Sequence, residues 1–176
     1  QEKEARILST CELLSMEIPA TAWVIPDLLP VGLTILAGAP KVGKSWLALQ
    51  IALAVVSDGS ALGKQADPGS GLYLALEDSP RRLKERMILQ GWQKTQQCDF
   101  ILMQDFQKII GYLDDQGMEN LGRLMEAKEY KLIVIDTLSR AIRGDQNDVG
   151  EMTEKLSPLQ EIAHRFNCAI VLIDHH

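Results

Sequence analysis

Five short, nearly continuous apolar runs recur along the chain, with helix-length segments between them. The runs are Leu33–Ala37, Gly71–Leu76, Asp99–Met103, Lys131–Asp136 and Ala169–Asp174. Four of them lack the alternation of apolar and polar residues that marks a strand with one wet face, so we expect strands buried on both faces. Strands that alternate with helices build a parallel sheet covered by helices. The sequence therefore predicts an α/β fold with a mostly parallel central sheet and helices on both faces.

The segments between the runs carry helix signals. Residues 44–57 are apolar almost all round, which predicts a helix buried against the sheet. Ser79-Pro80 supplies a cap and a first helical position for a second helix, and Gly91 would end that helix. A further helix is expected over residues 152–166, where Pro158 should kink or restart it.

The chain divides into two parts of different character. Its 176 residues have the size of one ordinary domain, which can bury enough apolar surface to be stable without disulfides. Residues 1–30 are proline-rich with a short helical start, so we expect a lead-in segment that packs on the domain edge or serves as a linker. Residues 31–176 form the core.

Charge and cysteine usage narrow the class of protein. The formal net charge of -6 argues against the chain as a whole being an electrostatic nucleic-acid binder. Cys11, Cys98 and Cys168 are scattered and lack metal-like spacing, as expected for a reducing compartment. The most apolar segment, Trp46–Val56, is far shorter than the roughly 20 residues of a membrane helix. Residues 1–6 show no signal-peptide pattern. We therefore expect a cytoplasmic protein without a membrane partner.

One octapeptide carries a complete phosphate-binding pattern. It matches G-x-x-x-x-G-K-S/T and lies between a predicted strand and a predicted helix, the context that this pattern requires. A glycine-containing loop lets backbone N–H groups converge on a phosphate chain, and the helix points its positive end at the same place. Lys44 would reach the β- and γ-phosphates, and the Ser45 hydroxyl would ligate Mg²⁺. The predicted cofactor-binding residues are Gly38, Ala39, Pro40, Lys41, Val42, Gly43, Lys44 and Ser45.

Polar side chains end three of the predicted strands. Asp136 follows a fully apolar run, at the edge where open α/β sheets bind ligands, which makes it a candidate Mg²⁺ ligand or a turn-capping residue. Of Glu77 and Asp78, Glu77 is nearer its strand and could poise a water opposite the γ-phosphate. The alternative is that both carboxylates cap the following helix. His175 and His176 end the last strand at the same edge.

These motifs, in this order, resemble the RecA-like ATPases of the plasmid replicative helicase type. These RepA-like proteins belong to the AAA_25 group and are related to the replicative hexameric helicases. The resemblance covers about Ile18–His176 and rests on GKSWLALQIA, LALEDS followed by RRLKERM, LIVIDTLSRA and AIVLIDHH. It implies a RecA-like P-loop NTPase fold, with ATP and Mg²⁺ as cofactors. It also implies single-stranded DNA as a partner of the full-length protein, and a homo-oligomeric ring, a hexamer, when the protein is complete.

The resemblance also assigns roles to individual residues. Glu77 resembles the catalytic base, and His175 resembles the sensor that detects the γ-phosphate and relays its presence to DNA-binding loops. In such proteins the strand that ends at this histidine lies between the phosphate-loop strand and the Asp136 strand. The implied catalytic residues are Lys44, Glu77 and His175, and the implied metal ligands are Ser45 and Asp136.

Several assignments stay open. His176 is an alternative sensor, because the register of the histidine pair is ambiguous. Residues 137–148 resemble the first loop that faces the channel of such rings, with Arg140 and Arg143 as candidates for DNA contact. A solvated basic loop explains these arginines equally well. Trp46 is expected to pack rather than to stack on a base. The arginines of the segment RRLKERM could face a neighbouring subunit or the nucleotide, but a plain charged helix face is the favoured description of Arg81, Arg82 and Arg86.

The end of the sequence suggests a truncated core. The second channel loop and the arginine finger of such rings would lie beyond His176, so we expect C-terminal strands to be missing. We therefore expect this fragment to bind ATP but to turn it over slowly. Two functions remain: the motor of a DNA helicase or of a DNA replication or repair ATPase, and an ATP-dependent regulatory or assembly module without unwinding activity. A small-molecule phosphotransferase is the weakest alternative.

Overall fold

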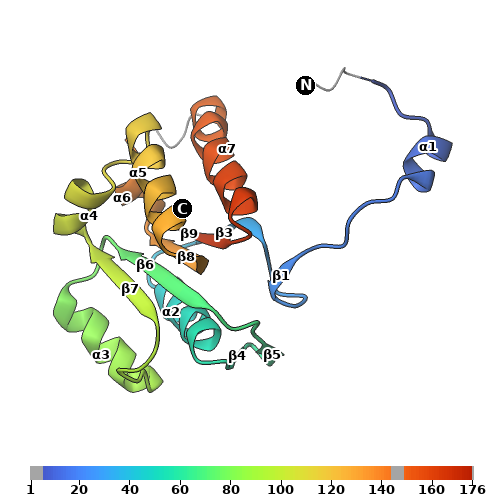
Figure 1. Ribbon diagram of the computed structural model, residues 1–176. Helices are drawn as coiled ribbons and strands as arrows, with labels where there is room; N and C mark the ends of the chain where they lie inside the picture. Colours follow the sequence, from blue (N-terminus) through green and yellow to red (C-terminus); the bar gives the residue numbers. More distant parts are fainter. Residues whose placement is uncertain (1–5, 144–148, 176) are drawn as a thin grey trace.

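The computed structural model, which describes residues 6–143 and 149–175, is built on a five-stranded parallel sheet (Figure 1). The strands are β3 (Gly32–Gly38), β6 (Ser70–Ala75), β7 (Cys98–Leu102), β8 (Tyr130–Asp136) and β9 (Ala169–His175). Their order is β3-β9-β8-β6-β7, and every neighbouring pair is parallel. All five predicted strands are confirmed, with ends shifted by at most one residue. The expected position of β9 between β3 and β8 is confirmed as well.

Helices cover both faces of this sheet, as predicted (Figure 1). One face is covered by α2 (Lys44–Val56) and α3 (Pro80–Gln90), and the other by α4 (Met103–Ile109), α5 (Asp115–Ala127), α6 (Leu138–Ala141) and α7 (Val149–Arg165). Ser79 caps α3 by accepting from the Arg82 N–H, and Gly91 ends it in a left-handed conformation. The restart predicted at Pro158 does not occur. Pro158 lies inside the single helix α7, which contacts β3 and β9 and is held by that packing.

The sheet separates two apolar clusters, and β8 contributes side chains to both of them. Leu132 and Val134 belong to the cluster under α2 and α3, whereas Ile133 and Ile135 belong to the cluster under α4–α7. All four side chains are fully buried. A strand buried on both faces cannot alternate apolar with polar residues, because either choice of face would bury the polar ones. This is why the strand runs read as almost continuously apolar.

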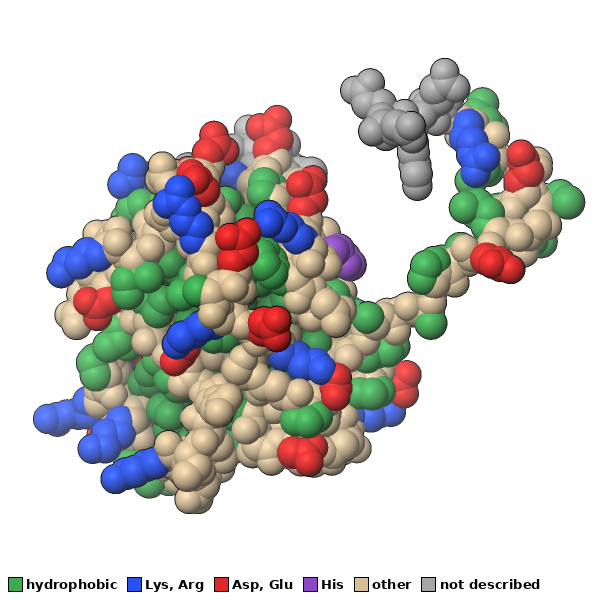
Figure 2. Space-filling model, viewed as in Figure 1, with side chains coloured by type: hydrophobic (Ala, Val, Ile, Leu, Met, Phe, Trp, Pro, Cys, Tyr) green, Lys and Arg blue, Asp and Glu red, His purple; other side chains and the backbone are tan. Residues whose placement is uncertain are grey.

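Residues 6–30 have two different structural settings. The hairpin of β1 (Trp23–Ile25) and β2 (Leu29–Pro30) contributes Val24, Ile25 and Leu29 to the core. Residues 6–22 are all exposed and include the short helix α1 (Thr10–Ser15). This helix stands clear of the rest of the domain in Figures 1 and 2. A second small hairpin, β4 (Ser60–Ala61) with β5 (Lys64–Gln65), follows α2. Within residues 6–143 and 149–175, no helix is long and apolar enough to cross a lipid bilayer.

Two glycines of α5 provide a matched test of how tightly this layer is packed. A Cβ added at Gly117 would lie 1.8 Å from the backbone oxygen of Tyr112, whereas one added at Gly122 would lie 3.5 Å from Ile162 Cδ1, an ordinary contact. Alanine gains about 1 kcal/mol over glycine in a helix when nothing obstructs it. We therefore expect Gly122→Ala to raise the free energy of unfolding by up to about 1 kcal/mol.

Gly117→Ala should instead lower it by about 1–3 kcal/mol, because the start of α5 must move away from the Tyr112 carbonyl. Urea denaturation of both variants measures the difference. Equal effects of the two substitutions would contradict the packing described here.

Candidate functional site

The loop between β3 and α2 is shaped by Gly43, the residue immediately before the helix. Gly43 has φ of 98°, in the left-handed region, and an added Cβ there would meet nothing within 4 Å. Backbone conformation, not lack of space, therefore requires glycine at this position. No side-chain hydrogen bond caps the start of α2. The N–H groups of its first turn are thus free to bind an anion, which the positive end of the helix favours.

Lys44 lies directly behind this loop. Its side chain is only 6% exposed, and Nζ donates to the carbonyl oxygens of Gly38 at 2.5 Å and of Ala39 at 2.7 Å. A buried ammonium group needs such partners, because removing it from water without them is costly. A phosphate in the loop would offer the same group an anionic partner, which forms a stronger hydrogen bond than a carbonyl does.

Asp136 ends β8 beside the loop and is 3% exposed. Its Oδ2 accepts a hydrogen bond of 2.9 Å from the Tyr73 hydroxyl, and its Oδ1 is buried without a partner among the described residues. Burial raises the pKa of Asp136. The nearby Ser45 and Tyr73 hydroxyls act in the opposite direction, and the charges of Asp78 and Glu77 raise the pKa further. The same burial, together with the neighbouring Asp136 carboxylate, raises the pKa of Tyr73 well above its usual range.

The unpartnered oxygen of Asp136 fits a magnesium ligand. Mg²⁺ prefers oxygen ligands and is commonly held by one or two carboxylates together with substrate phosphates and water. Over the described ranges, no three His, Cys, Asp or Glu side chains are grouped so as to hold a metal ion by themselves. Ser45 and Asp136 would therefore need the phosphates of a nucleotide to complete a metal site.

Glu77 lines the same cleft as the loop and has two neighbours, His175 and Arg140. His175 Nε2 is 3.2 Å from Glu77 Oε2, and Arg140 Nε is 3.9 Å from Glu77 Oε1. His175 reaches this place because β9 pairs with β3 in a register that sets His175 opposite Gly38. Its Nδ1 is buried with no partner in the described chain. His176, the alternative sensor, lies outside the described residues.

A cleft of about 580 Å³ collects most of the predicted site residues on the carboxyl edge of the sheet. The predicted residues that line it are Pro40, Lys41, Gly43, Lys44, Ser45, Glu77, Asp136 and His175. Gly38 and Ala39 do not line the cleft. Their carbonyl oxygens instead accept hydrogen bonds from Lys44 Nζ. The Val42 side chain is exposed. The geometry thus gathers a phosphate loop, a buried carboxylate and a second carboxylate with a histidine partner.

Sequence reasoning missed the role of Tyr73, which lies beneath the cleft. Its hydroxyl donates a hydrogen bond to Asp136, and the only signal was that hydroxyl in the apolar run GLYLAL. Arg82 and Arg86 both line the cleft and pair with Asp78, so the favoured description of a plain charged helix face is wrong for these two arginines.

The arginines of the predicted channel loop both have partners within the chain. Arg140 pairs with Glu77, and the Arg143 guanidinium lies 4.0 Å from the ring centre of Tyr112. Residues 144–148 of this loop lie outside the described residues.

Comparisons with known proteins agree with the fold. A family model described as an AAA domain, AAA_25, matches residues 1–176. Among solved structures, RadB recombinase has a TM-score of 0.54 and 21% sequence identity over 84% of this chain and 62% of that one. A KaiC-like protein from the hyperthermophilic archaeon Pyrococcus horikoshii has a TM-score of 0.57 and 19% identity over 87% of this chain and 67% of that one. The chain therefore spans less than two thirds of the RadB recombinase chain. At these identities the likeness shows a shared RecA-like fold.

The burial of Asp136 makes a prediction about stability. An ionised carboxylate with one unpartnered oxygen destabilises the folded state, so we expect Asp136→Asn to raise the free energy of unfolding in EDTA by about 1 kcal/mol. For a chain of this size that raises the melting temperature by about 2–4 °C. Asp27→Asn is the control, because Asp27 forms an exposed ion pair with Lys64 and its loss should change little. A less stable Asp136→Asn protein would contradict this account of the buried charge.

Proposed function

The chain belongs to the AAA_25 family, and from the geometry of its cleft we propose that it is a Mg²⁺-dependent ATPase. The observation that carries this proposal is the Glu77 carboxylate, which lines the same cleft as the predicted phosphate loop and lies near both His175 and Arg140. A site that only stores a nucleotide needs donors for phosphate. A carboxylate in the same cleft is what hydrolysis requires in addition, since the attacking water must lose a proton.

The phosphate side of the site depends on Lys44 and α2. The N–H groups of the first turn of α2 would bind the phosphate oxygens, and Lys44 Nζ would exchange its loop carbonyls for oxygens of the β- and γ-phosphates. Mg²⁺, held by Ser45 Oγ and Asp136 Oδ1, would neutralise the charge that develops on the phosphates. Tyr73 fixes the other oxygen of Asp136, so the carboxylate is oriented in advance.

The hydrolytic side depends on Glu77. Its carboxylate would accept a proton from a water placed opposite the γ-phosphate. The imidazole of His175 would donate from Nε2 to Glu77 Oε2 and so orient the carboxylate. His175 ends β9 and Arg140 lies in α6. A movement of the Glu77 side chain when the γ-phosphate is lost would therefore change contacts in both of these elements. We propose that this linkage couples hydrolysis to a second action of the protein.

The second action that we propose is movement on single-stranded DNA by a homo-oligomeric ring, as in a helicase or a replication or repair ATPase. Its support is the order of the motifs through AIVLIDHH. The neighbours in structure do not decide the question, because one is named a recombinase and the other KaiC-like. The alternative, a regulatory or assembly module in the cytoplasm, is favoured by the internal partners of Arg140 and Arg143 and by the net charge of -6.

Glu77→Gln tests the hydrolytic role. The amide cannot accept the proton of the attacking water, so we expect turnover to fall by about 100-fold or more while ATP affinity stays within about threefold. Lys44→Ala should instead weaken ATP binding itself. Steady-state phosphate release and calorimetric titration with ATP separate the two effects. Glu85→Gln, on the exposed side of α3, is the matched control and should leave both quantities unchanged. Full turnover by Glu77→Gln would show that another group is the base.

DNA dependence separates the two proposed actions. We expect ATP turnover per chain to rise with protein concentration and to rise again when single-stranded DNA is added, because ring sites are shared between subunits. Turnover measured over a hundredfold range of protein concentration, with and without a single-stranded oligonucleotide, provides the test. If the oligonucleotide leaves ATP turnover unchanged at every protein concentration, the regulatory module would be favoured.

A further inference from the structure

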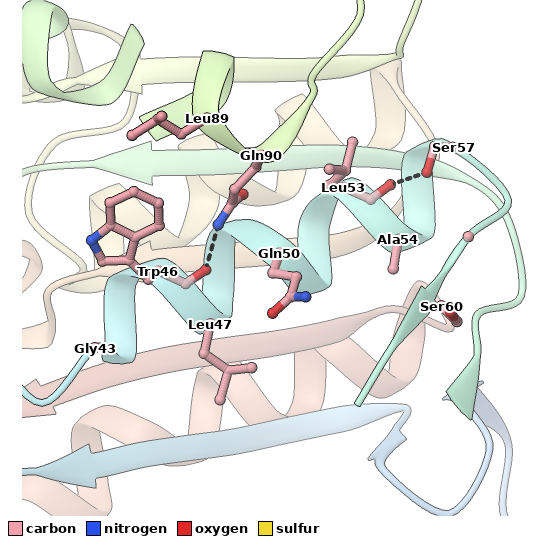
Figure 3. A pocket seen from close by; sticks show the side chains of 11 residues that line it. Gly43, Trp46, Leu47, Gln50, Leu53, Ala54, Ser57, Ser60, Leu89 and Gln90 are labelled. Carbon is pink, nitrogen blue, oxygen red and sulfur yellow. Dashed lines mark hydrogen bonds between the residues drawn. The ribbon is translucent and has the colours of Figure 1, made fainter. Parts of the chain in front are cut away.

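A groove of about 640 Å³ runs along the outer side of α2 and begins at the phosphate loop (Figure 3). Trp46, Gln50 and Leu53 of α2 line it, and Leu89 at the end of α3 borders it. Its volume lies within the range of about 300–1,000 Å³ that is usual for small-molecule sites. The function proposed above uses the cleft that holds Lys44, Glu77 and Asp136 and makes no use of this groove.

The groove and the catalytic cleft meet at two residues. Gly43 and Trp46 line both. Gly43 precedes α2 and Trp46 lies in its first turn, which is where the N–H groups of a phosphate loop hold the phosphates. A nucleotide whose phosphates occupy the cleft must project its sugar and base outward past this turn. The groove adjoins the cleft at this turn, so it is placed to receive them.

Trp46 is placed to contact such a base. Its side chain is 39% exposed, which is unusual for a large aromatic residue whose only role is packing. The Arg86 guanidinium lies over its ring, 5.6 Å from the centroid, and Arg86 is itself paired with Asp78. The backbone oxygen of Trp46 accepts a hydrogen bond of 2.9 Å from Gln90 Nε2 (Figure 3). The hydrogen bond anchors the backbone of Trp46, and the Arg86 contact restrains the indole ring, so the ring loses less conformational freedom when a base stacks on it.

We propose that this groove is the nucleoside subsite of the nucleotide-binding site, with Trp46 as the stacking platform for a purine base. The Gln50 side chain, which also lines the groove, supplies an amide donor and acceptor for the edge of the base. This inference rests on the proposed function, since it assumes that phosphates bind at the loop. It replaces the expectation that Trp46 only packs.

The test compares a ligand that has a base with one that has only phosphates. Calorimetric titration of the whole chain with ADP and with pyrophosphate gives two affinities for each variant. We expect Trp46→Ala to weaken ADP binding by about tenfold, because stacking of a base on an aromatic ring contributes about that factor. Pyrophosphate binding should stay unchanged. Trp46→Phe keeps an aromatic face and should restore most of the ADP affinity.

Two further variants separate the possible failures. Leu62→Ala, at an exposed apolar residue of the turn between β4 and β5, should change neither affinity. Lys44→Ala should weaken ADP and pyrophosphate alike, which reports on the phosphate site alone. If Trp46→Ala weakens both ligands equally, or neither, the nucleoside subsite is elsewhere and the proposal is overturned while the ATPase proposal stands. If the unsubstituted chain binds neither ligand, the proposed function fails first.

Discussion

The pairing of β9 with both β3 and β8 is the constraint on which the rest of the structure depends. It sets Gly38 opposite His175, and Asp136 opposite Ile173. Parallel strands bring their carboxyl ends to one edge, so these residues meet although they are far apart in the sequence. A slip of one residue in β9 would turn its apolar side chains to the wrong clusters and would move His175 away from Glu77. Fold stability and site geometry therefore depend on the same register.

The site places charges where a folded core tolerates them poorly. Lys44 and Asp136 are both buried, and each is stabilised by only a few neighbouring polar atoms. Such groups persist in proteins when a ligand makes use of them, because ligand binding then returns stability to the folded state. Tyr73 illustrates the arrangement. It stacks on Phe100 in the core and presents its hydroxyl to Asp136, so the apolar layer itself positions the carboxylate.

The sequence was sufficient for the parts of the structure that local signals determine. Continuous apolar runs located the five strands, and Ser79 with Gly91 marked the ends of α3, because burial on both faces and helix capping leave direct traces in the order of residues. The pattern that predicts a phosphate-binding loop was equally local. The role of each predicted site residue remains a prediction, but Lys44, Glu77, Asp136 and His175 do lie around one cleft.

Contacts between elements that are distant in the chain could not be predicted in this way. The hydrogen bond from Tyr73 to Asp136 and the position of Arg86 over Trp46 depend on how neighbouring elements pack, which no local pattern records. Pro158 shows the converse error. A local rule predicted a kink or a restart there, and the restart is wrong, because α7 continues through Pro158 while it packs on β3.

The exposed segment that carries α1 implies two very different local stabilities within one chain. The helix has six residues and a capping box between Ser9 and Glu12, but it buries no side chain. Isolated helices below about 12–15 residues are marginal in water, so the amide hydrogens of α1 should exchange with solvent through local fraying. The amides of β8, enclosed by both apolar clusters, can exchange only when the whole domain opens. The boundary between these regimes falls at the β1–β2 hairpin, where the chain first becomes part of the cooperative unit.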